Sequence, residues 1–246
     1  MRPSPPGAYV LPIDAEQPDP GYRVPGTEKN MKVRIVLDIA CAWSALGYTR
    51  FGHAVERFRA EGGEADVEFL PFQVAPTAPV EGELLSEVHR RVFGPSVEAK
   101  TARMAALAAR SGLEMNFDRA VFANTLDAHR LIARATAQGR GEQIVHRLFR
   151  AYFTEGLNVA DPAVLERLAL EAGVGAGGRA PVAESDPVSA GQRVVRELGV
   201  TSVPVFLFDG GETLVGAQSE EGFLAALRNA AVMVGAPAGV APSTAG

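Results

Sequence analysis

The sequence predicts an α/β domain that is interrupted by a helical insertion. Short β-branched or apolar runs typical of strands lie toward the two ends of the chain, whereas the pattern from Leu84 to Leu170 is almost wholly helical. The first two runs flank a helical segment, which is the order of a βαβ unit with a right-handed crossover. The chain of 246 residues is long enough for one such domain with another inserted in it.

Three predicted elements open the α/β domain. The β-branched run "KVRIVLDI" (32–39) suits a buried strand. Residues 44–62 then have helical spacing, which stops at Gly62-Gly63. The run "ADVEFLPFQV" (65–74) reads as the second strand, and the "APTAP" that follows breaks it.

The middle of the chain carries a series of helical patterns. They cover residues 96–112, 118–140, 141–156 and 161–173. Ser96, Asp118 and Asp161 are predicted N-caps, and Pro162 suits a first helical position.

The C-terminal part returns to strands. After a Gly- and Pro-rich connection (174–187), a helix is predicted over 189–199. Residues 200–217 hold two apolar runs around a Gly-Gly turn, which predicts a β-hairpin. A last helix is expected over 220–234, with Ser219 as its N-cap.

Composition and charge limit the classes of function. Hydrophobic residues make up 47% and charged residues 22% of the chain, as in globular proteins. A net charge of −5, with both signs mixed along the helices, argues against a nucleic-acid or membrane surface. Residues 1–30 are Pro-rich and lack the apolar core of a signal peptide, so we expect a disordered tail and a cytoplasmic protein.

The segment "DIACAWSALGY" (38–48) holds the only cysteine, Cys41, and the only tryptophan, Trp43. Because it joins a predicted strand to a predicted helix, unpaired amides and the helix dipole are expected to favour a thiolate and lower the pKa of Cys41. A small hydrophobic side chain packed under the sheet is the alternative, and position alone leaves both open. One cysteine excludes an intramolecular disulfide. His129 and His146 lack a nearby carboxylate at ligand spacing, so no metal site is expected.

The same segment resembles the active-site segment of the DsbA-like branch of the thioredoxin superfamily. More narrowly, it resembles the cytoplasmic DsbA family oxidoreductases of the polyketide-cluster (frenolicin) type, in which the segment reads Cys-Pro-Trp-Cys. Further similar segments lie in the same order at 124–131, 147–165, 198–210 and 215–223. The resemblance covers about residues 32–231 and implies a thioredoxin fold with an inserted all-helical domain and a catalytic Cys41.

The chain departs from this family pattern at the residues that follow the reactive cysteine. Ala42 stands in place of the usual proline and Ser44 in place of the second cysteine. Without a second thiol, a protein can neither donate an internal disulfide nor release a mixed disulfide by itself. A Ser44 hydroxyl can still donate a hydrogen bond to the Cys41 thiolate and lower its pKa. The related 2-hydroxychromene-2-carboxylate isomerases and kappa-class glutathione transferases carry serine at the first position, so the site looks like a hybrid of two branches.

The resemblance also marks residues outside this segment. Pro204 in "TSVP" matches the cis-proline of the superfamily, and the Val203 backbone is expected to lie against the thiol and to pair with a substrate peptide or with glutathione. Asn124 and His129 belong to a helix that the family places over the active site. They are candidates for substrate binding, with a capping or buried hydrogen-bonding role as the alternative.

Three functions follow from these features. The first is a monothiol thiol–disulfide oxidoreductase that acts through Cys41 and Ser44, with Ala42 and Trp43 as neighbours and a role in natural-product (polyketide) tailoring. The second is a glutathione- or mycothiol-dependent isomerase or transferase, and the third is a redox-inactive binding module. No tightly bound cofactor is expected beyond such a small thiol. The expected partner is a small-molecule or thiol substrate, with no nucleic acid and no membrane, and a homodimer is left open.

The expected organisation follows the same resemblance. Its parts are a disordered tail (1–30), the first part of the thioredoxin domain (31–80), the helical insertion (81–185), the second part of the thioredoxin domain (186–232) and a flexible tail (233–246).

Overall fold

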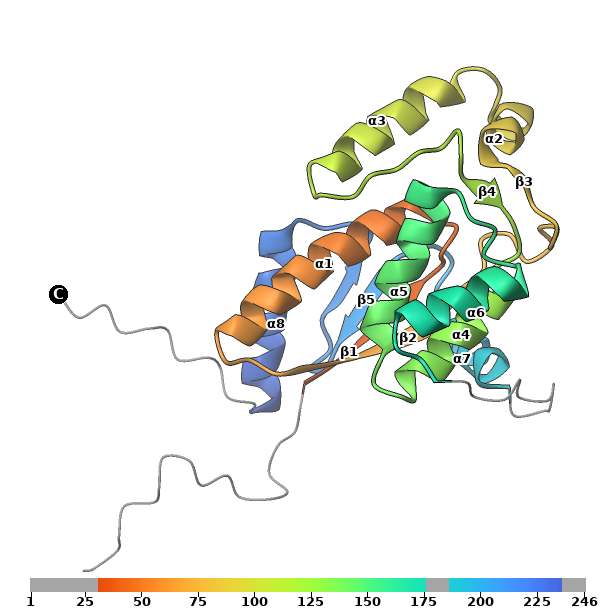
Figure 1. Cartoon of the computed structure of the whole chain (residues 1–246). Helices are drawn as coiled ribbons and strands as arrows, with labels where there is room; N and C mark the ends of the chain where they lie inside the picture. Colours follow the sequence, from red (N-terminus) through yellow and green to blue (C-terminus); the bar gives the residue numbers. More distant parts are fainter. Residues whose placement is uncertain (1–30, 176–185, 236–246) are drawn as a thin grey trace, which may run out of the picture.

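A four-stranded mixed sheet lies at the centre of the computed structural model, which describes residues 31–175 and 186–235 (Figure 1). The strand order is β2-β1-β5-β6. The strands are Met31–Leu37 (β1), Ala65–Pro71 (β2), Val205–Phe208 (β5) and Thr213–Val215 (β6). Strands β1 and β2 are parallel, whereas β5 is antiparallel to both β1 and β6. The predicted strand–helix–strand unit and the predicted hairpin are therefore confirmed.

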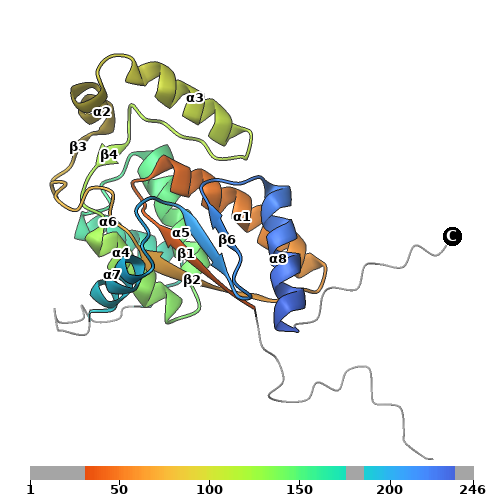
Figure 2. The ribbon, with the colours of Figure 1, turned by 180° about the vertical axis from the view of Figure 1, so that it is seen from behind.

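The helices fall into two groups. Those that accompany the sheet are α1 (Ala42–Ala60), α7 (Pro187–Glu197) and α8 (Glu220–Val234). The insertion holds α2 (Leu85–Phe93), α3 (Val97–Ala109), α4 (Leu126–Thr136), α5 (Gly141–Phe149), the π-helix η1 (Arg150–Glu155) and α6 (Pro162–Glu171), with the short paired strands β3 (Glu83–Leu84) and β4 (Val121–Phe122). Helices α1 and α8 lie side by side, while α2 and α3 stand apart from the sheet (Figures 1 and 2).

The alternation of side chains along β1 divides the core between two faces of the sheet. Val33, Ile35 and Leu37 are fully buried in the main core, which includes residues of α1, α8 and the insertion. Val36 points to the other face and packs with Val195 of α7. Side chains of a strand alternate between faces, so a buried run such as β1 can fill both layers at once.

Several predicted helix starts are confirmed by hydrogen bonds. Asp161 accepts from the backbone N–H of Ala163, and Pro162 is the first residue of α6. Ser219 accepts from Gly222 N at the start of α8. Ser96 precedes α3 without a side-chain capping bond.

The predicted helix start at Asp118 is wrong. Residues 117–119 form a turn, residues 121–122 pair with β3, and α4 begins only at Leu126. The pairing of β4 holds the backbone extended there. The side chain of Asn124 accepts from Leu126 N and provides the local start of the helix.

This sheet order, with α1 and α8 on one face and α7 on the other, is a thioredoxin fold with an insertion after β2, as predicted. The insertion is mainly helical but not all-helical as expected, because β3 and β4 pair within it. Three predicted segments lie outside the described residues: the tail 1–30, residues 176–185 of the connection and residues 236–246 of the C-terminal tail.

Helix α8 runs to Val234, two residues beyond the expected end of the thioredoxin domain at 232. No helix in the described ranges has both the length and the apolar character needed to cross a membrane.

Candidate active site

Cys41 is the N-cap residue of α1, directly after the turn that follows β1. Its backbone is extended, with φ −94° and ψ 113°. Its N–H donates to the Asp38 carbonyl at 3.1 Å, and its carbonyl accepts from Ala45 N at 3.0 Å. The side chain is a partly buried free thiol. The turn and the first helical bond therefore fix the sulfur at the start of the helix.

A segment remote in sequence lies against this sulfur. The distance from Cys41 Sγ to the Val203 carbonyl oxygen is 3.7 Å. The Val203–Pro204 peptide bond is cis, as expected. Gly47 on α1 permits the close approach of this loop, because a Cβ atom there would lie 3.0 Å from Pro204 Cγ. The loop before β5 and the first turns of α1 thus form one surface.

The residues after Cys41 divide between the interior and the solvent. Ser44 is fully buried, and its Oγ accepts from Asp38 N at 3.5 Å. Trp43 is 53% exposed. The hydroxyl that replaces the second cysteine therefore lies in the interior and is hydrogen-bonded to the thiol, while the Trp43 side chain is exposed at the surface.

The pKa of the Cys41 thiol is raised, so the expectation of a lowered value is wrong. Burial is the largest cause, and the negative charge of Asp38 adds to it. Hydrogen bonds from the Ser44 side chain and from the backbone N–H groups of Ser44 and Trp43 lower the pKa as predicted, but desolvation outweighs them. The resting site therefore holds a thiol at neutral pH.

A buried carboxylate and imidazole lie under the same turn. His129 Nε2 is 3.4 Å from Asp38 Oδ1 and 2.8 Å from the Phe72 carbonyl oxygen. Asp38 Oδ2 accepts from Val74 N at 2.7 Å, and its Oδ1 accepts from Ala40 N at 3.4 Å. The pair joins the end of β1, the segment after β2 and helix α4.

The sequence analysis did not identify Asp38 as a buried carboxylate beside the Cys41 turn. The available signal was a polar residue that ends an apolar strand three positions before Cys41. The pair does not extend into a metal-binding cluster, because no group of three or more His, Cys, Asp or Glu side chains within 31–175 and 186–235 is placed to hold an ion.

Asn124 is bonded to the protein's own backbone and to a neighbouring amide. Its Nδ2 donates to the Pro76 carbonyl at 2.8 Å, and its Oδ1 accepts from Gln73 Nε2 at 3.1 Å as well as from Leu126 N. His129, only 3% exposed, holds the same segment through Phe72. These contacts correspond to the structural alternative considered for Asn124 and His129.

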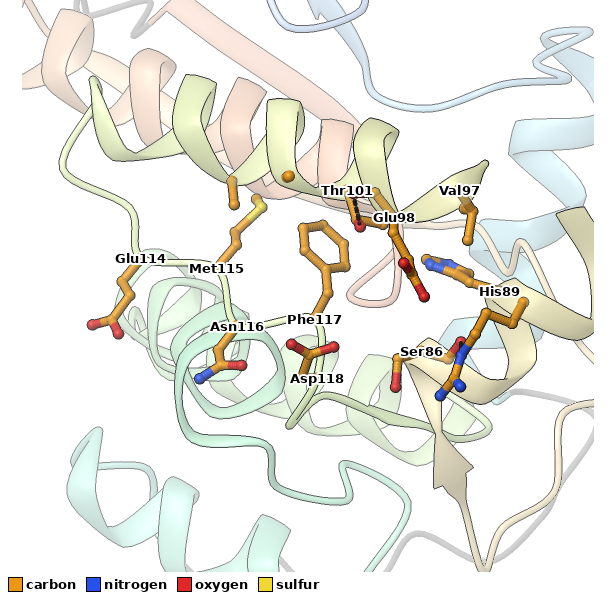
Figure 3. A pocket seen from close by; sticks show the side chains of 13 residues that line it. Ser86, His89, Val97, Glu98, Thr101, Glu114, Met115, Asn116, Phe117 and Asp118 are labelled. Atoms are coloured by element: carbon orange, nitrogen blue, oxygen red, sulfur yellow. Dashed lines mark hydrogen bonds between the residues drawn. The ribbon is translucent and has the colours of Figure 1, made fainter. Parts of the chain in front are cut away.

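A cavity of about 470 Å³ lies in the helical insertion (Figure 3). Helix α2, helix α3 and residues 114–118 line it, with His89, Met115 and Phe117 among the side chains along its wall. Neither Cys41 nor Val203 belongs to this lining. The cavity and the thiol site are therefore separate features.

A thiol at a strand-to-helix turn, facing a cis-proline loop, defines the site of a thioredoxin-fold protein. The model of the DSBA-like thioredoxin domain matches residues 32–228, and the chain belongs to this family. The crystal structure of a probable DsbA oxidoreductase from Streptomyces coelicolor is 30% identical, with a TM-score of 0.72 over 81% of this chain and 89% of that chain. The suspected family is confirmed.

More distant structures share the fold. The cytosolic disulfide reductase DsbM from Pseudomonas aeruginosa is 20% identical, with a TM-score of 0.52 over 83% of this chain and 97% of that chain. A 2-hydroxychromene-2-carboxylate isomerase is 14% identical, with a TM-score of 0.56 over 76% of this chain and 89% of that chain. One fold thus carries both a reductase and an isomerase.

Proposed function

We propose that this chain is a monothiol thiol–disulfide exchange enzyme. The observation that carries the proposal is the free thiol of Cys41 at the start of α1, 3.7 Å from the Val203 carbonyl, with Ser44 buried where a resolving cysteine would stand. Membership of the DsbA-like family supports an oxidoreductase reaction.

Two exchange steps complete the reaction. First, the Cys41 thiolate attacks one sulfur of a substrate disulfide, the S–S bond breaks, and the other sulfur leaves as a thiolate with the bonding electrons. Cys41 then carries a mixed disulfide. Second, the thiolate of a small thiol such as glutathione or mycothiol attacks the substrate-derived sulfur, and the Cys41 thiolate leaves. The number of disulfides is unchanged overall, and Ser44 cannot replace the small thiol because it has no sulfur.

The surroundings of Cys41 suit a small-molecule or thiol substrate. The Val203 backbone and the exposed Trp43 flank the sulfur, while Asp38, His129 and Asn124 hold the adjoining segment after β2. The proposal places the reaction in the cytoplasm, where small thiols are kept reduced. Its biological setting in the proposal is the tailoring of a natural product.

A second candidate is a glutathione- or mycothiol-dependent isomerase or transferase. The raised pKa of Cys41 favours it, because a protonated thiol is a poor nucleophile but can still donate a hydrogen bond to a bound thiolate. In this reaction the small thiol performs the chemistry, and Cys41 only orients it.

The Cys41→Ser variant separates the two candidates. We expect complete loss of thiol exchange between glutathione and 2-hydroxyethyl disulfide, because no other side chain here can form the mixed disulfide. The Ser44→Ala variant keeps Cys41 and should retain exchange at a reduced rate, because it loses only a hydrogen bond that lowers the pKa of Cys41. Substantial turnover by Cys41→Ser, at an unchanged urea midpoint, would overturn the proposal and favour the second candidate.

A further inference from the structure

Tyr152 carries a buried hydroxyl that has no hydrogen-bond partner within the described residues. The side chain is fully inaccessible to solvent. The buried Tyr48, by contrast, donates its hydroxyl proton to the Glu142 carbonyl at 3.0 Å. A buried polar group without a partner is unfavourable, so its presence calls for a physical explanation.

The backbone around Tyr152 is unusual and lies close to the active site. Residues 150–155 form the π-helix η1, which continues α5. π-Helical turns are rare and often occur at functional sites. In both ribbon views the end of α5 and η1 lie beside the first turn of α1, which Cys41 caps (Figures 1 and 2).

The hydroxyl of Tyr152 also interacts electrostatically with the site. Burial raises its pKa, and the negative charge of Asp38 and that of Cys41, once Cys41 is ionised, raise it further. Asp38 and the ionised Cys41 are therefore the anionic groups whose charge reaches the Tyr152 hydroxyl. The oxygens of Asp38 already accept from Val74 N and Ala40 N and face His129.

The donors already present at the Cys41 sulfur do not offset the cost of burying a thiolate there. In the resting state the Cys41 thiol faces the carbonyl oxygen of Val203 at 3.7 Å, which can accept from a thiol but repels a thiolate. Ser44 and two backbone N–H groups supply donors, yet burial still dominates. A further donor is useful only once the sulfur is charged.

We propose that Tyr152 is a hydrogen-bond donor held without a partner at rest for the thiolate that forms on Cys41. On ionisation the thiol proton passes to solvent, the sulfur loses its bond to Val203, and the Tyr152 O–H donates to the charged sulfur. Such preorganised donors stabilise charge where it develops. The inference rests on the proposed function, in which the Cys41 thiolate is the nucleophile.

The Tyr152→Phe variant removes only this hydroxyl. We expect the pKa of Cys41, measured by the pH dependence of iodoacetamide alkylation, to rise by about one unit, which is a roughly ten-fold loss of thiolate at neutral pH. The urea midpoint should not fall, because no resting hydrogen bond is lost. In the matched variant Tyr48→Phe the midpoint should fall while the pKa of Cys41 stays unchanged.

An unchanged pKa of Cys41 in Tyr152→Phe would overturn the inference, as would a fall in its urea midpoint equal to that of Tyr48→Phe. Alkylation does not depend on the natural reaction. A shifted pKa without any mixed disulfide on the parent protein would therefore support the donor role of Tyr152 and contradict the proposed function alone.

Discussion

His129 Nε2 lies 3.4 Å from Asp38 Oδ1, and both side chains are buried next to the turn that carries Cys41. Asp38 directly follows β1, the first strand of the thioredoxin domain, and His129 belongs to the inserted helix α4. The pair therefore ties the insertion to the active-site turn, and the charge of Asp38 reaches the thiol.

Replacement of Asp38 by Asn should lower the pKa of Cys41. The negative charge of Asp38 disfavours the thiolate, and the amide keeps the size of the side chain while removing that charge. Alkylation at neutral pH should accelerate several-fold. The control is Asp66→Asn, an exposed position on β2, which should leave the rate unchanged. A slower reaction of Asp38→Asn would show that its hydrogen bonds matter more than its charge.

The two glycines of α1 offer a matched test of the contact with the cis-proline loop. A Cβ at Gly47 would lie 3.0 Å from Pro204 Cγ and 3.3 Å from Ala217 Cα, whereas a Cβ at Gly52 meets nothing within 4 Å. We expect Gly47→Ala to reduce the free energy of unfolding by about 1–3 kcal/mol through overpacking. Gly52→Ala should raise it by about 0.5–1 kcal/mol. Urea titrations of both variants check this, and equal stabilisation by both would contradict the packing described.

Substitution of Ser44 should change the thiol chemistry in two directions. Ser44→Ala removes a hydrogen bond that lowers the pKa of Cys41, so the pKa should rise and alkylation at neutral pH should slow. Ser44→Cys should allow an internal disulfide, detected as loss of both free thiols on mild oxidation. Two thiols that persist under oxidation would mean that positions 41 and 44 cannot reach bonding distance.

The stability of the protein should fall with pH through the ionisation of Cys41. The unfolded pKa is about 8.5, and the folded pKa is raised above its ordinary value. Between these values the unfolded chain has lost a proton that the folded chain keeps. The thiol's contribution is therefore fully present below about pH 8.5 and is lost as pH rises through the folded pKa. Urea unfolding from pH 8 upward should show this slope, and Cys41→Ala should reduce it. An equal slope in both proteins would contradict the raised pKa.

Local signals in the sequence predicted much of the fold. The β-branched run of β1, the Gly-Gly hairpin and the caps Asp161 and Ser219 depend on neighbouring residues, so they can be read from sequence. The helix start at Asp118 failed because the pairing of β4 with β3 overrides local preference.

The features of the active site that the sequence did not predict also depend on contacts between distant segments. Two features exist only after the insertion packs against β1 and α1. They are the proximity of Asp38 to His129 and the burial of a Tyr152 hydroxyl that finds no partner among the described residues. The pKa of Cys41 was predicted in the wrong direction because the helix start is a local feature, whereas burial depends on the complete fold.

Intact mass spectrometry tests the central claim, that Cys41 forms a covalent mixed disulfide, most directly. The parent protein and Cys41→Ser are incubated separately with glutathione disulfide and mycothiol disulfide at mildly alkaline pH, where a thiol of raised pKa begins to ionise. The account predicts one small-thiol adduct on the parent with at least one of these reagents, its removal by the matching free thiol, and no adduct on Cys41→Ser. A parent protein that stays unmodified by both disulfides would contradict it.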